Sequence, residues 1–474
     1  WNGIVGRMEL RALEQIRLHD VHVFPHSNLR GIKIKIALAH PVEADLPVRL
    51  RLAVLRDGDG GLIAEEERQV RVQGDGAGGG ISEYELDMEA DCAPWDEFTP
   101  NLHRLRVELE AGWGAKRIRD SGAVTFGMRT FRANGTRFEV NGRPTFLRGT
   151  LDCCIYPMTG YPPMDEASWE RVFGIVKAYG LNHVRFHSWC PPEAAFRAAD
   201  RLGLYLQAEG PVWMDTWHMT VGQYPDHYDY LPAEAERIRA AYGNHPSFCL
   251  FSNGNELNGD FKLLHDIIAS LKERDDRRVY TLSTGWGRAQ DPADDYIAAF
   301  QADGIGARGE FYHEALTAST MLDYSEAAAK HTIPLVSHEI GQYAVYPNVH
   351  EIGKYTGALV PVNYEAIRRD LERKGLLQDA HRFVMGSGKL ALQLYREEIE
   401  AALRTPGMAG FQLLDLHDFP GQTTATVGIL DAFWDSKGLI EPERFREFCA
   451  PTVLLLRMPS RIYTSGEPFS AAAE

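Results

Sequence analysis

Two glutamates follow apolar segments at places where they could do acid–base chemistry. The stretch NHPSFCLFSNGNE (244–256) starts with an apolar run and ends on Glu256. The stretch IPLVSHEIGQY (333–343) has the same form and carries Glu339. A single glutamate beyond an apolar run is more often a solvated loop residue, but two of them favour a shared pocket. Two carboxylates in one pocket can hydrolyse a glycosidic bond, one as acid and base, the other as nucleophile or activator of water.

The secondary-structure elements that would bring the two glutamates together are expected from about residue 131 onward. There, helical segments alternate with short apolar runs. One unit begins at Asp165, a helix cap, and stops near Gly180. Its apolar face has the helical spacing i, i+3, i+4, i+7 and consists of Trp169, Val172, Phe173 and Val176.

Eight candidate strands recur with the same rhythm. They are 145–150, 182–187, 204–209, 248–252, 279–284, 305–311, 333–338 and 409–415, of which 305–311 is the weakest. Eight strands over about 270 residues predict a (β/α)8 TIM barrel, in which the carboxyl ends of the strands form the active-site mouth. A doubly wound parallel sheet is the alternative.

Residues 18–130 have a different texture. Strict alternation of apolar and polar residues appears in RGIKIKIALAH (30–40), PVRLRLAVLRD (47–57) and HRLRVELEAG (103–112). Turn-rich stretches separate these runs, which predicts an immunoglobulin-like β-sandwich. Residues 449–474 become β-like again and are interpreted as the start of a further C-terminal β domain.

The composition of the chain argues against some classes of binding partner. Acidic residues outnumber basic ones by 66 to 50, which gives a formal net charge of -16. Such a charge argues against nucleic acid and against an anionic membrane surface. The six cysteines show no CxxC spacing and are expected to be buried free thiols. The chain starts and stops inside strand-like phrases and is interpreted as part of a longer protein.

The stretch 244–256 resembles the acid/base signature of glycoside hydrolase family 2. The matching positions are Asn244, His245, Pro246, Ser247, Ser252, Asn255 and Glu256. Phe251 stands where the family usually has tryptophan. PWDEFTPNLHRLRVEL (94–109) and FGMRTFRANGTRFEVNGRPTFLRGT (126–150) resemble the family's late sandwich strand and its crossing into the barrel.

This resemblance implies a multidomain chain and assigns roles. The implied domains are 1–17, the remnant of an N-terminal jelly-roll sugar-binding domain; 18–130, the sandwich; 131–448, the catalytic TIM barrel; and 449–474, the truncated C-terminal β domain. Glu256 would be the acid/base, Glu339 the nucleophile, and Asn255 a ligand of the sugar 2-hydroxyl. The family retains anomeric configuration, so the two carboxylates are expected about 5–5.5 Å apart.

Other strand ends carry residues that can form the walls of a sugar pocket. Aromatic rings there stack on sugars or plug the barrel mouth, and any of these residues could instead be part of the packing. The expected substrate-binding set, besides Asn255, is Asp152, His187, Trp189, Glu209, Trp213, Trp286, Tyr312, Asp415 and His417. Family members place a tyrosine at the position of Tyr312, which makes it the candidate donor that keeps Glu339 ionised.

No metal and no cofactor are expected. GIGARG (304–309) matches GxGxxG but lacks the strand and helix of a dinucleotide site. DGDGG (57–61) resembles a calcium loop, but Leu62 occupies the required glycine position. The histidines show no metal-ligand spacing.

The expected function is a retaining exo-glycosidase that cleaves a terminal equatorial, β-D-type bond of an oligo- or polysaccharide. β-Galactosidase is the base-rate choice among the activities of the family. An enzyme that recognises a uronic acid should offer a basic cluster at the pocket, and only Arg185 and Arg308 lie near strand ends. The alternatives are an endo-acting glycanase of a related barrel family and a non-catalytic carbohydrate-binding relative. The sequence leaves a homo-oligomer open, and it leaves the compartment open between the cytoplasm and the periplasm or exterior.

Overall fold

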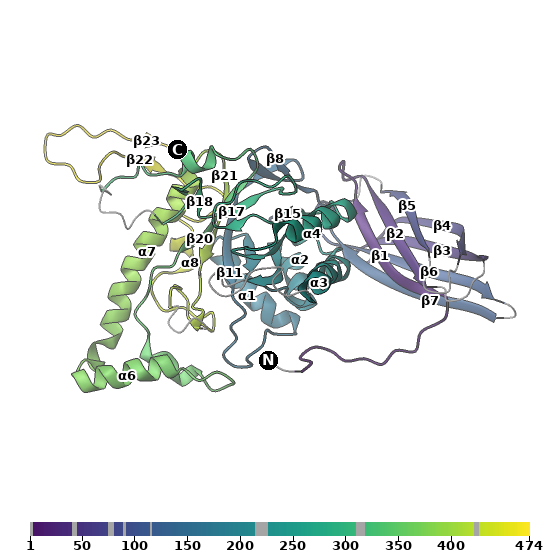
Figure 1. Cartoon of the computed structure of the whole chain (residues 1–474), viewed down its shortest axis with the longest axis horizontal. Helices are drawn as coiled ribbons and strands as arrows, with labels where there is room; N and C mark the ends of the chain where they lie inside the picture. Colours follow the sequence, from purple (N-terminus) through teal and green to yellow (C-terminus); the bar gives the residue numbers. More distant parts are fainter. Residues whose placement is uncertain are drawn as a thin grey trace.

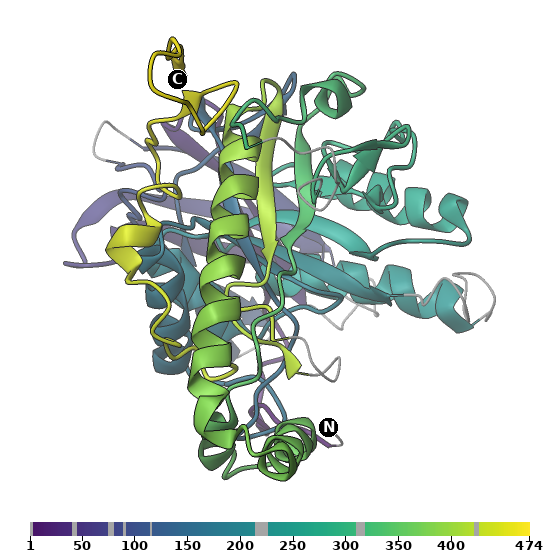
Figure 2. The ribbon, with the colours of Figure 1, turned by 90° about the vertical axis from the view of Figure 1, so that its left-hand side faces the viewer.

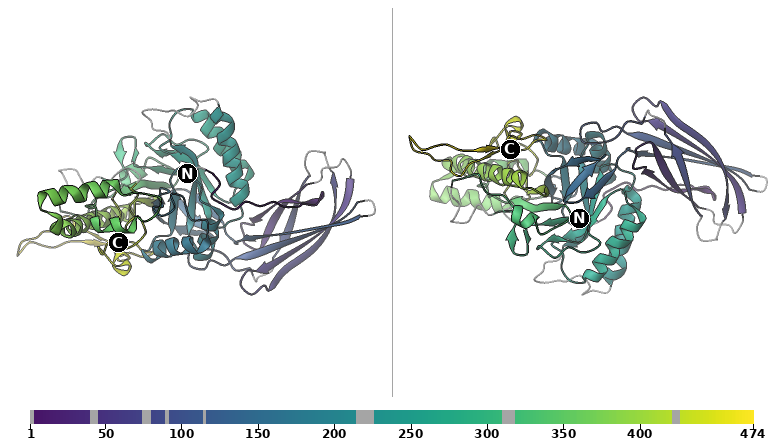
Figure 3. Two further views of the ribbon diagram at one scale, coloured as in Figure 1. Left: turned by 90° about the horizontal axis from the view of Figure 1, so that it is seen from below. Right: turned by 90° about the horizontal axis from the view of Figure 1, so that it is seen from above.

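The computed structural model describes residues 3–39, 45–73, 80–88, 92–113, 116–213, 226–309, 318–420 and 426–474. A β domain and a larger α/β body lie next to each other along the longest axis (Figure 1). Views from below and above place the β domain on one side of the barrel and the helices of residues 362–404 on the other (Figure 3). Among the described helices, none is both long and apolar enough to cross a membrane.

The β domain consists of two antiparallel sheets around one core. The first has the order β1 (Arg17–Pro25), β2 (Gly31–Ala39), β5 (Ile81–Asp87). The second has the order β4 (Leu62–Gln73), β3 (Asp45–Arg56), β6 (His103–Trp113), β7 (Lys116–Phe126). Side chains alternate across a strand, so Ile32, Ile34 and Ile36 are fully buried while Lys33 and Lys35 reach the other face. The core contains these isoleucines and the apolar residues of β3 and β6.

The α/β body is built on one parallel sheet that closes into a barrel. Its order is β15-β14-β13-β12-β11-β21-β20-β17-β16. The bounds are β11 (Leu147–Asp152), β12 (His183–Phe186), β13 (Tyr205–Trp213), β14 (Phe248–Asn255), β15 (Val279–Thr281), β16 (Thr284–Gly285), β17 (Ile297–Ala299), β20 (Leu335–Gly341) and β21 (Met408–Leu414). The predicted TIM barrel is therefore confirmed.

The barrel closes through an interrupted fifth strand. β15 pairs with β14 and β16 pairs with β17, so the two segments are parts of one strand that breaks at Leu282 and Ser283. The buried carboxylate of Asp294 accepts hydrogen bonds at this break from Leu282 N (2.8 Å), Ser283 Oγ (2.6 Å) and Thr281 Oγ1 (3.0 Å). The break thus keeps its polar groups satisfied inside the barrel wall.

Helix α1 (Glu166–Ala178) confirms the unit predicted from spacing. Asp165 caps it by accepting from Ser168 N, and its buried residues are Trp169, Val172, Phe173 and Val176. Gly180 has φ +80°, and a Cβ there would lie 1.8 Å from the carbonyl oxygen of Cys449. Only glycine fits such a left-handed position under so close a neighbour.

The remaining helices surround the barrel or extend from it. They are α2 (Glu193–Leu202), α3 (Asp226–Tyr242), α4 (Phe261–Arg274), α5 (Ser325–Ala328), α6 (Val362–Lys374), α7 (Ala380–Arg404) and α8 (Pro442–Phe445), with 3-10 turns η2 (Val349–Lys354) and η3 (Leu377–Asp379). The long helix α7 runs alongside the last strands and continues below them to α6 (Figure 2). Beyond α8, β22 (Leu456–Arg457) pairs with β23 (Ala472–Ala473).

The prediction of the sixth strand at 305–311 is wrong. The barrel strand is β17 (Ile297–Ala299), which pairs with β20. Ile305 and Gly306 form β19, which pairs with β18 (Gln301–Ala302) in a hairpin outside the barrel sheet. Three apolar residues are too short a run to stand out in the sequence, although all three are buried.

A small sheet closes the end of the barrel opposite the mouth. It has the order β10 (Arg143–Thr145), β9 (Arg137–Val140), β8 (Phe131–Asn134). Phe131, Phe138 and Val140 from this sheet share one buried cluster with Leu250 and Val336 of the barrel strands. The catalytic mouth must therefore lie at the other end, where the strands have their carboxyl termini.

Asn244, the first residue of the motif that ends on Glu256, joins the barrel to the β domain. Its side-chain amide accepts from Val23 N (2.9 Å) and donates to the carbonyl of Val21 (2.7 Å) in β1. Arg277 donates to Asn244 Oδ1 and to the carbonyl of Val23, both at 2.9 Å, and its guanidinium lies over the Phe24 ring. Asn244 is thus a residue of the domain junction.

Candidate active site

Glu256 and Glu339 lie at the carboxyl ends of two barrel strands. Glu256 directly follows the last residue of β14, and Glu339 is two residues from the end of β20. Both have left-handed backbones, with φ of +44° and +55°. Such conformations cost a non-glycine residue on the order of 1–2 kcal/mol and concentrate at functional sites. The backbone departs from the extended strand at the two residues that the sequence singles out.

The end of the fifth strand leaves room for Glu256. Gly285 in β16 has φ +81°, and a Cβ there would lie 2.8 Å from Glu256 Cγ. A neighbouring glycine, Gly254, lets β13 approach: a Cβ at this position would meet the carbonyl oxygen of Val212 at 1.8 Å. β14 itself continues through Ser252, Asn253 and Gly254 to Asn255, so Glu256 follows the strand directly.

Arg185 of β12 is the centre of the site. Its fully buried guanidinium donates to Glu209 Oε1 (2.6 Å), Glu339 Oε1 (3.0 Å) and Asn255 Oδ1 (2.6 Å). Burial alone would lower the pKa of Arg185, but the charges of Glu209 and Glu339 raise it above its usual value. One permanent cation therefore holds residues from β13, β14 and β20 around a single point.

Glu209, in the middle of β13, completes this centre. Its carboxylate also accepts from Ser188 N (2.7 Å), Gln207 Nε2 (2.9 Å) and Ser252 Oγ (3.1 Å), and the side chain is fully buried. Burial acts to raise the pKa of Glu209, but Arg185 and these donors hold it below its usual value. With its lone pairs occupied, Glu209 anchors Arg185 beneath the pocket.

Two histidines lie beside Glu339: His338 precedes it in β20, and His187 follows β12. His187 Nε2 and His338 Nε2 lie 3.7 Å and 3.6 Å from Glu339 Oε1. Burial lowers the pKa of both imidazoles, and the charge of Arg185 lowers them further. Near neutral pH both rings are therefore uncharged, whereas Arg185 is a cation that donates to the Glu339 carboxylate.

Asp152 and Asp415 form a second polar group beneath the mouth. Asp152 accepts from Tyr156 OH (2.6 Å), and burial raises its pKa. Asp415 accepts from Thr150 Oγ1 (2.6 Å). His417 lies 3.4 Å from Asp415 and stacks on Trp434 at 4.0 Å between ring centroids. Burial would lower the pKa of His417, but Asp415 raises it above its usual value.

The predicted aromatic residues occupy different surroundings. Trp189 donates from Nε1 to the carbonyl of Asp152 (2.9 Å) and packs edge-on against Phe186, so it is part of the rim packing. Trp286 is 47% exposed beyond β16 and is available to a ligand. Trp213 ends β13, but its side chain and the whole of Tyr312 lie outside the described residues.

Two basic residues have larger roles than their place near strand ends indicated. Arg185 sits inside an apolar strand, a signal for a buried charge with partners. Arg308 follows the β18–β19 hairpin; its Nη1 donates to the carbonyls of His338 (2.7 Å) and Glu339 (2.6 Å) and lies 3.9 Å from Glu339 Oε2. Burial lowers the pKa of Arg308, opposed by the charges of Glu339, Glu398 and Glu256. Arg308 thus links the environments of both glutamates.

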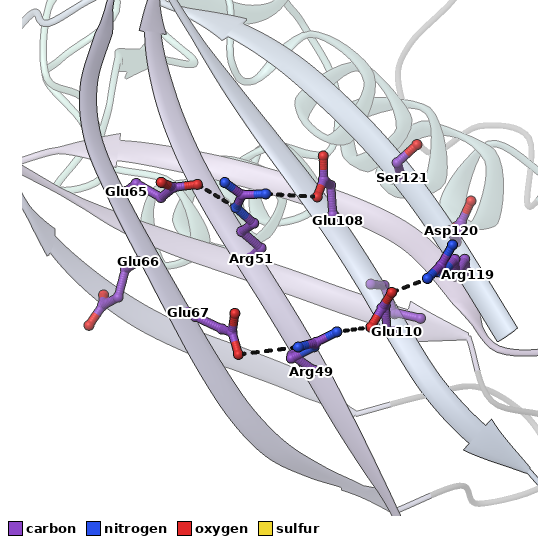
Figure 4. A pocket seen from close by; sticks show the side chains of 11 residues that line it. Arg49, Arg51, Glu65, Glu66, Glu67, Glu108, Glu110, Arg119, Asp120 and Ser121 are labelled. Carbon is purple, nitrogen blue, oxygen red and sulfur yellow. Dashed lines mark hydrogen bonds and ion pairs between the residues drawn. The ribbon is translucent and has the colours of Figure 1, made fainter. Parts of the chain in front are cut away.

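One surface hollow lies away from this mouth. It has a volume of about 890 Å³ and follows the outer face of the four-stranded sheet of the β domain. There Arg51 lies between Glu65 and Glu108, and Arg49 between Glu67 and Glu110 (Figure 4). Its arginines are paired with carboxylates across the strands, which fits a solvated face rather than a site.

Many histidines, cysteines, aspartates and glutamates lie among the described residues. Within them, no group of three or more His, Cys, Asp or Glu side chains is arranged to hold a metal ion. All six cysteines are free thiols, and Cys92, Cys249 and Cys449 are buried.

Fold and site together define a class of protein. A TIM barrel that presents two glutamates at its carboxyl-terminal mouth, with buried polar groups beneath them, has the architecture of a glycoside hydrolase. Residues 131–355 match the family model described as Glycosyl hydrolases family 2, TIM barrel domain. This match covers the greater part of the barrel and supports its assignment to glycoside hydrolase family 2.

Known proteins agree with this assignment. The chain is 31% identical over 168 residues to "Beta-galactosidase 2" of Enterobacter cloacae, covering 35% of this chain and 16% of that protein. It is 29% identical over 314 residues to the beta-galactosidase of Aeromonas hydrophila subsp. hydrophila, covering 64% and 29%. The chain therefore aligns with less than a third of the length of these curated relatives.

Solved structures share the fold at low sequence identity. Bacteroides uniformis beta-glucuronidase 2 superposes with a TM-score of 0.67 and 15% identity, covering 94% of this chain and 53% of that one. The GH2 beta-galacturonidase of Eisenbergiella tayi gives a TM-score of 0.66 and 16% identity, covering 92% and 72%.

Proposed function

We propose that this chain is the catalytic part of a retaining exo-β-glycosidase that acts on a terminal equatorial glycosidic bond. The observation that carries the proposal is the position of Arg185. Its guanidinium binds Glu339 and also Asn255, the neighbour of Glu256. Two glutamates from facing strands are thereby placed at one mouth, with a permanent cation beside Glu339.

The proposed reaction is a double displacement. Glu339 attacks the anomeric carbon while Glu256 gives its proton to the glycosidic oxygen, so the bond to the leaving group breaks and a glycosyl ester forms on Glu339. Glu256, now a carboxylate, takes a proton from water as the water oxygen attacks the anomeric carbon. The ester bond breaks, and the sugar leaves with its original configuration.

The surroundings of the two glutamates suit these roles. Arg185 Nη1 lies 3.0 Å from Glu339 Oε1 and Arg308 Nη1 lies 3.9 Å from Glu339 Oε2, so two cations stand beside the carboxylate that is proposed to attack. Asn255 Oδ1 is occupied by Arg185, so its Nδ2 is the group that would donate to the sugar 2-hydroxyl. The proposal also requires the carboxylates of Glu256 and Glu339 to stand about 5–5.5 Å apart; a separation near 9 Å in a sugar complex would contradict retention.

For the sugar, a β-galactoside is proposed because the curated relatives are beta-galactosidases. The structural relatives include a beta-glucuronidase and a beta-galacturonidase, so uronides are the second class to test. Arg308 is the basic residue of the mouth that a sugar carboxylate could approach.

The domain assignment is part of the proposal. Residues 18–130 are proposed to be an immunoglobulin-like sandwich, supported by the three- and four-stranded antiparallel sheets around one core. Residues 131–448 are the catalytic barrel. That residues 1–17 belong to a jelly-roll domain and residues 449–474 to a further β domain stays a prediction.

A panel of aryl glycosides tests the function. The chain is incubated with β-galactoside, β-glucuronide, β-galacturonide, β-glucoside and β-mannoside, and the anomer released first is identified by NMR. We expect hydrolysis of one sugar class, the β-anomer as the first product, and a loss on the order of 10⁴-fold in Glu339→Gln. Hydrolysis of oligosaccharides alone would favour the endo-glycanase, and no hydrolysis of any sugar would favour the carbohydrate-binding relative.

A further inference from the structure

A buried carboxylate outside the mouth contacts the backbone on both sides of the site. Glu398 lies on α7 and is fully buried. Its Oε1 accepts from Gly309 N (2.6 Å), and its Oε2 accepts from Gly341 N (3.0 Å) and from Tyr343 OH (2.8 Å). These partners are groups of Gly309, Gly341 and Tyr343, so the role argued for Glu398 acts through these contacts.

The two glycine amides belong to the segments that carry Arg308 and Glu339. Gly309 follows Arg308 directly, and Gly341 is two residues beyond Glu339. Both glycines have left-handed backbones, with φ of +67° and +96°. A carboxylate that binds both amides therefore fixes the loop after the β18–β19 hairpin relative to the end of β20.

The side chain of Arg308 forms a second link between the loop after the β18–β19 hairpin and the end of β20. Arg308 Nη1 donates to the carbonyls of His338 and Glu339, and Glu339 itself has a left-handed φ of +55°. Glu398 thus holds the loop that holds the peptide of Glu339. Without the Glu398 carboxylate, Gly309 would lose its anchor. Arg308 directly precedes Gly309, so the contact of its guanidinium with the carbonyls of His338 and Glu339 would loosen as well.

Helix α7 gives this unit a rigid support. It spans Ala380–Arg404 and runs alongside β20 and β21 (Figure 2). Tyr395 from the same helix lies so close that a Cβ at Gly341 would meet its ring at 2.1 Å, and its hydroxyl donates to the carbonyl of Val427 (2.8 Å). The helix therefore packs directly against the segment that turns at Glu339.

We propose that Glu398 is a positioning residue that holds Arg308 and Glu339 in their catalytic arrangement. This inference rests on the proposed function, in which Glu339 is the nucleophile. Burial raises the pKa of Glu398, and the hydrogen bonds from Tyr343, Gly309 and Gly341 oppose this shift. In its ionised form the carboxylate offers two acceptor oxygens and no donor to two N–H groups and one O–H group. An amide would set its own N–H₂ against one of these donors, and an aspartate would be one methylene too short to reach both glycines.

The test compares Glu398→Gln and Glu398→Asp with Glu400→Gln as matched control. Glu400 lies two residues away on the same helix and pairs with Arg396 (2.7 Å) and Arg404 (3.3 Å), so its loss perturbs α7 without touching either glycine. Steady-state kinetics on the best aryl glycoside give kcat and KM. Amide hydrogen exchange reports on residues 305–309 and 339–343, and thermal unfolding confirms that each variant is folded.

We expect both Glu398 variants to lower kcat roughly 100-fold with KM changed less than about threefold, since a misplaced catalytic group costs rate rather than binding. Exchange should accelerate in both segments, and Glu400→Gln should leave kcat and both exchange rates unchanged. Faster exchange with unchanged kcat overturns the inference, and so does unchanged exchange in the folded variants. A wild-type chain that hydrolyses no glycoside overturns the proposed function, while the exchange rates still decide whether Glu398 holds the two segments.

Discussion

Arg185 and Glu339 are 154 residues apart in the chain, yet Nη1 of the first lies 3.0 Å from Oε1 of the second inside the barrel mouth. Arg185 is fully buried and Glu339 nearly so. The same guanidinium holds Glu209 and Asn255. Because these partners come from three other strands, the pair couples the stability of the barrel to the geometry of its site.

Replacing Arg185 with Met should destabilise the fold strongly. Glu209 and Glu339 would be left as buried carboxylates without their cation, which costs about 3–5 kcal/mol in the free energy of unfolding. Urea denaturation measures this loss. The control is Arg197→Met, which removes an exposed ion pair with Glu193 (2.7 Å) and should cost no more than about 1 kcal/mol. Equal losses in the two variants would contradict a central role for Arg185.

Glu256→Gln should separate substrates by their leaving groups. A glycoside with a poorly acidic alcohol needs a proton from Glu256, so its kcat should fall about 10²- to 10⁴-fold. A glycoside of an acidic phenol departs without that proton, and its first step should be affected much less. Burst and steady-state kinetics on a leaving-group series measure the difference. Glu273→Gln, an exposed position on α4, serves as control, and a uniform loss across the series would argue against the acid/base role.

The fold should lose stability as the pH falls below about 6.5. His183 is fully buried: its Nδ1 lies 2.7 Å from the carbonyl of Tyr205 and its Nε2 3.0 Å from Gln412 Nε2. Burial lowers its pKa from 6.5 to about 4. Below pH 6.5 the unfolded chain therefore binds a proton at His183 that the folded chain does not bind. The free energy of unfolding is retained above pH 6.5 and declines toward pH 4 by on the order of 3 kcal/mol.

Urea midpoints at pH 7.5 and pH 4.5 measure this decline. His183→Gln should flatten the pH dependence, because the unfolded variant has no imidazole to protonate at this position. The exposed His350→Gln should leave it as in the wild type. A decline of the same size in His183→Gln and in the wild type would assign the effect to other groups.

Asn244→Ala should weaken the junction between the domains. The variant loses the hydrogen bonds to Val21 and Val23 and a partner of Arg277, which costs about 1–3 kcal/mol where the groups stay buried. We expect earlier proteolysis at the junction and a splitting of the thermal transition, measured by limited digestion and calorimetry. Asn134→Ala, which removes one exposed hydrogen bond to Glu139 (2.7 Å), is the control. A single unchanged transition would show that the amide contributes little.

Local patterns predicted local structure well. The helix after Asp165 and the alternating strand of Ile32, Ile34 and Ile36 depend on neighbours within a few residues, so spacing alone reveals them. The prediction of the sixth strand failed because β17 has only three residues. The predicted segment contains Ile305 and Gly306, which pair with Gln301 and Ala302 in a hairpin instead. Closure of the barrel needed Asp294, whose partners lie 11 to 13 residues away and leave no periodic signal.

The site could be predicted only where a residue stands at a strand end. Glu256 and Glu339 were found in this way, and their catalytic roles stay predictions. Arg185, Arg308 and Glu398 act through partners far away in the chain, and Glu398 lies on a helix with no motif around it. Conversely, Trp189 was expected to contact the substrate, but its Nε1 donates to the carbonyl of Asp152. Asn244, a position of the family signature, is held at the domain junction by backbone groups of β1. Residue type does not distinguish a sugar ligand from a structural donor.

The hydrogen bonds of Asn244 also matter while the chain is being translated. β1 is an outer strand of its sheet, and the β domain leaves the ribosome before the barrel is complete. Until residue 244 arrives, the N–H of Val23 and the carbonyl of Val21 present an unpaired edge to other nascent chains, a template for aggregation. Asn244 and Arg277 seal that edge, so completing the barrel also protects the neighbouring domain from self-association.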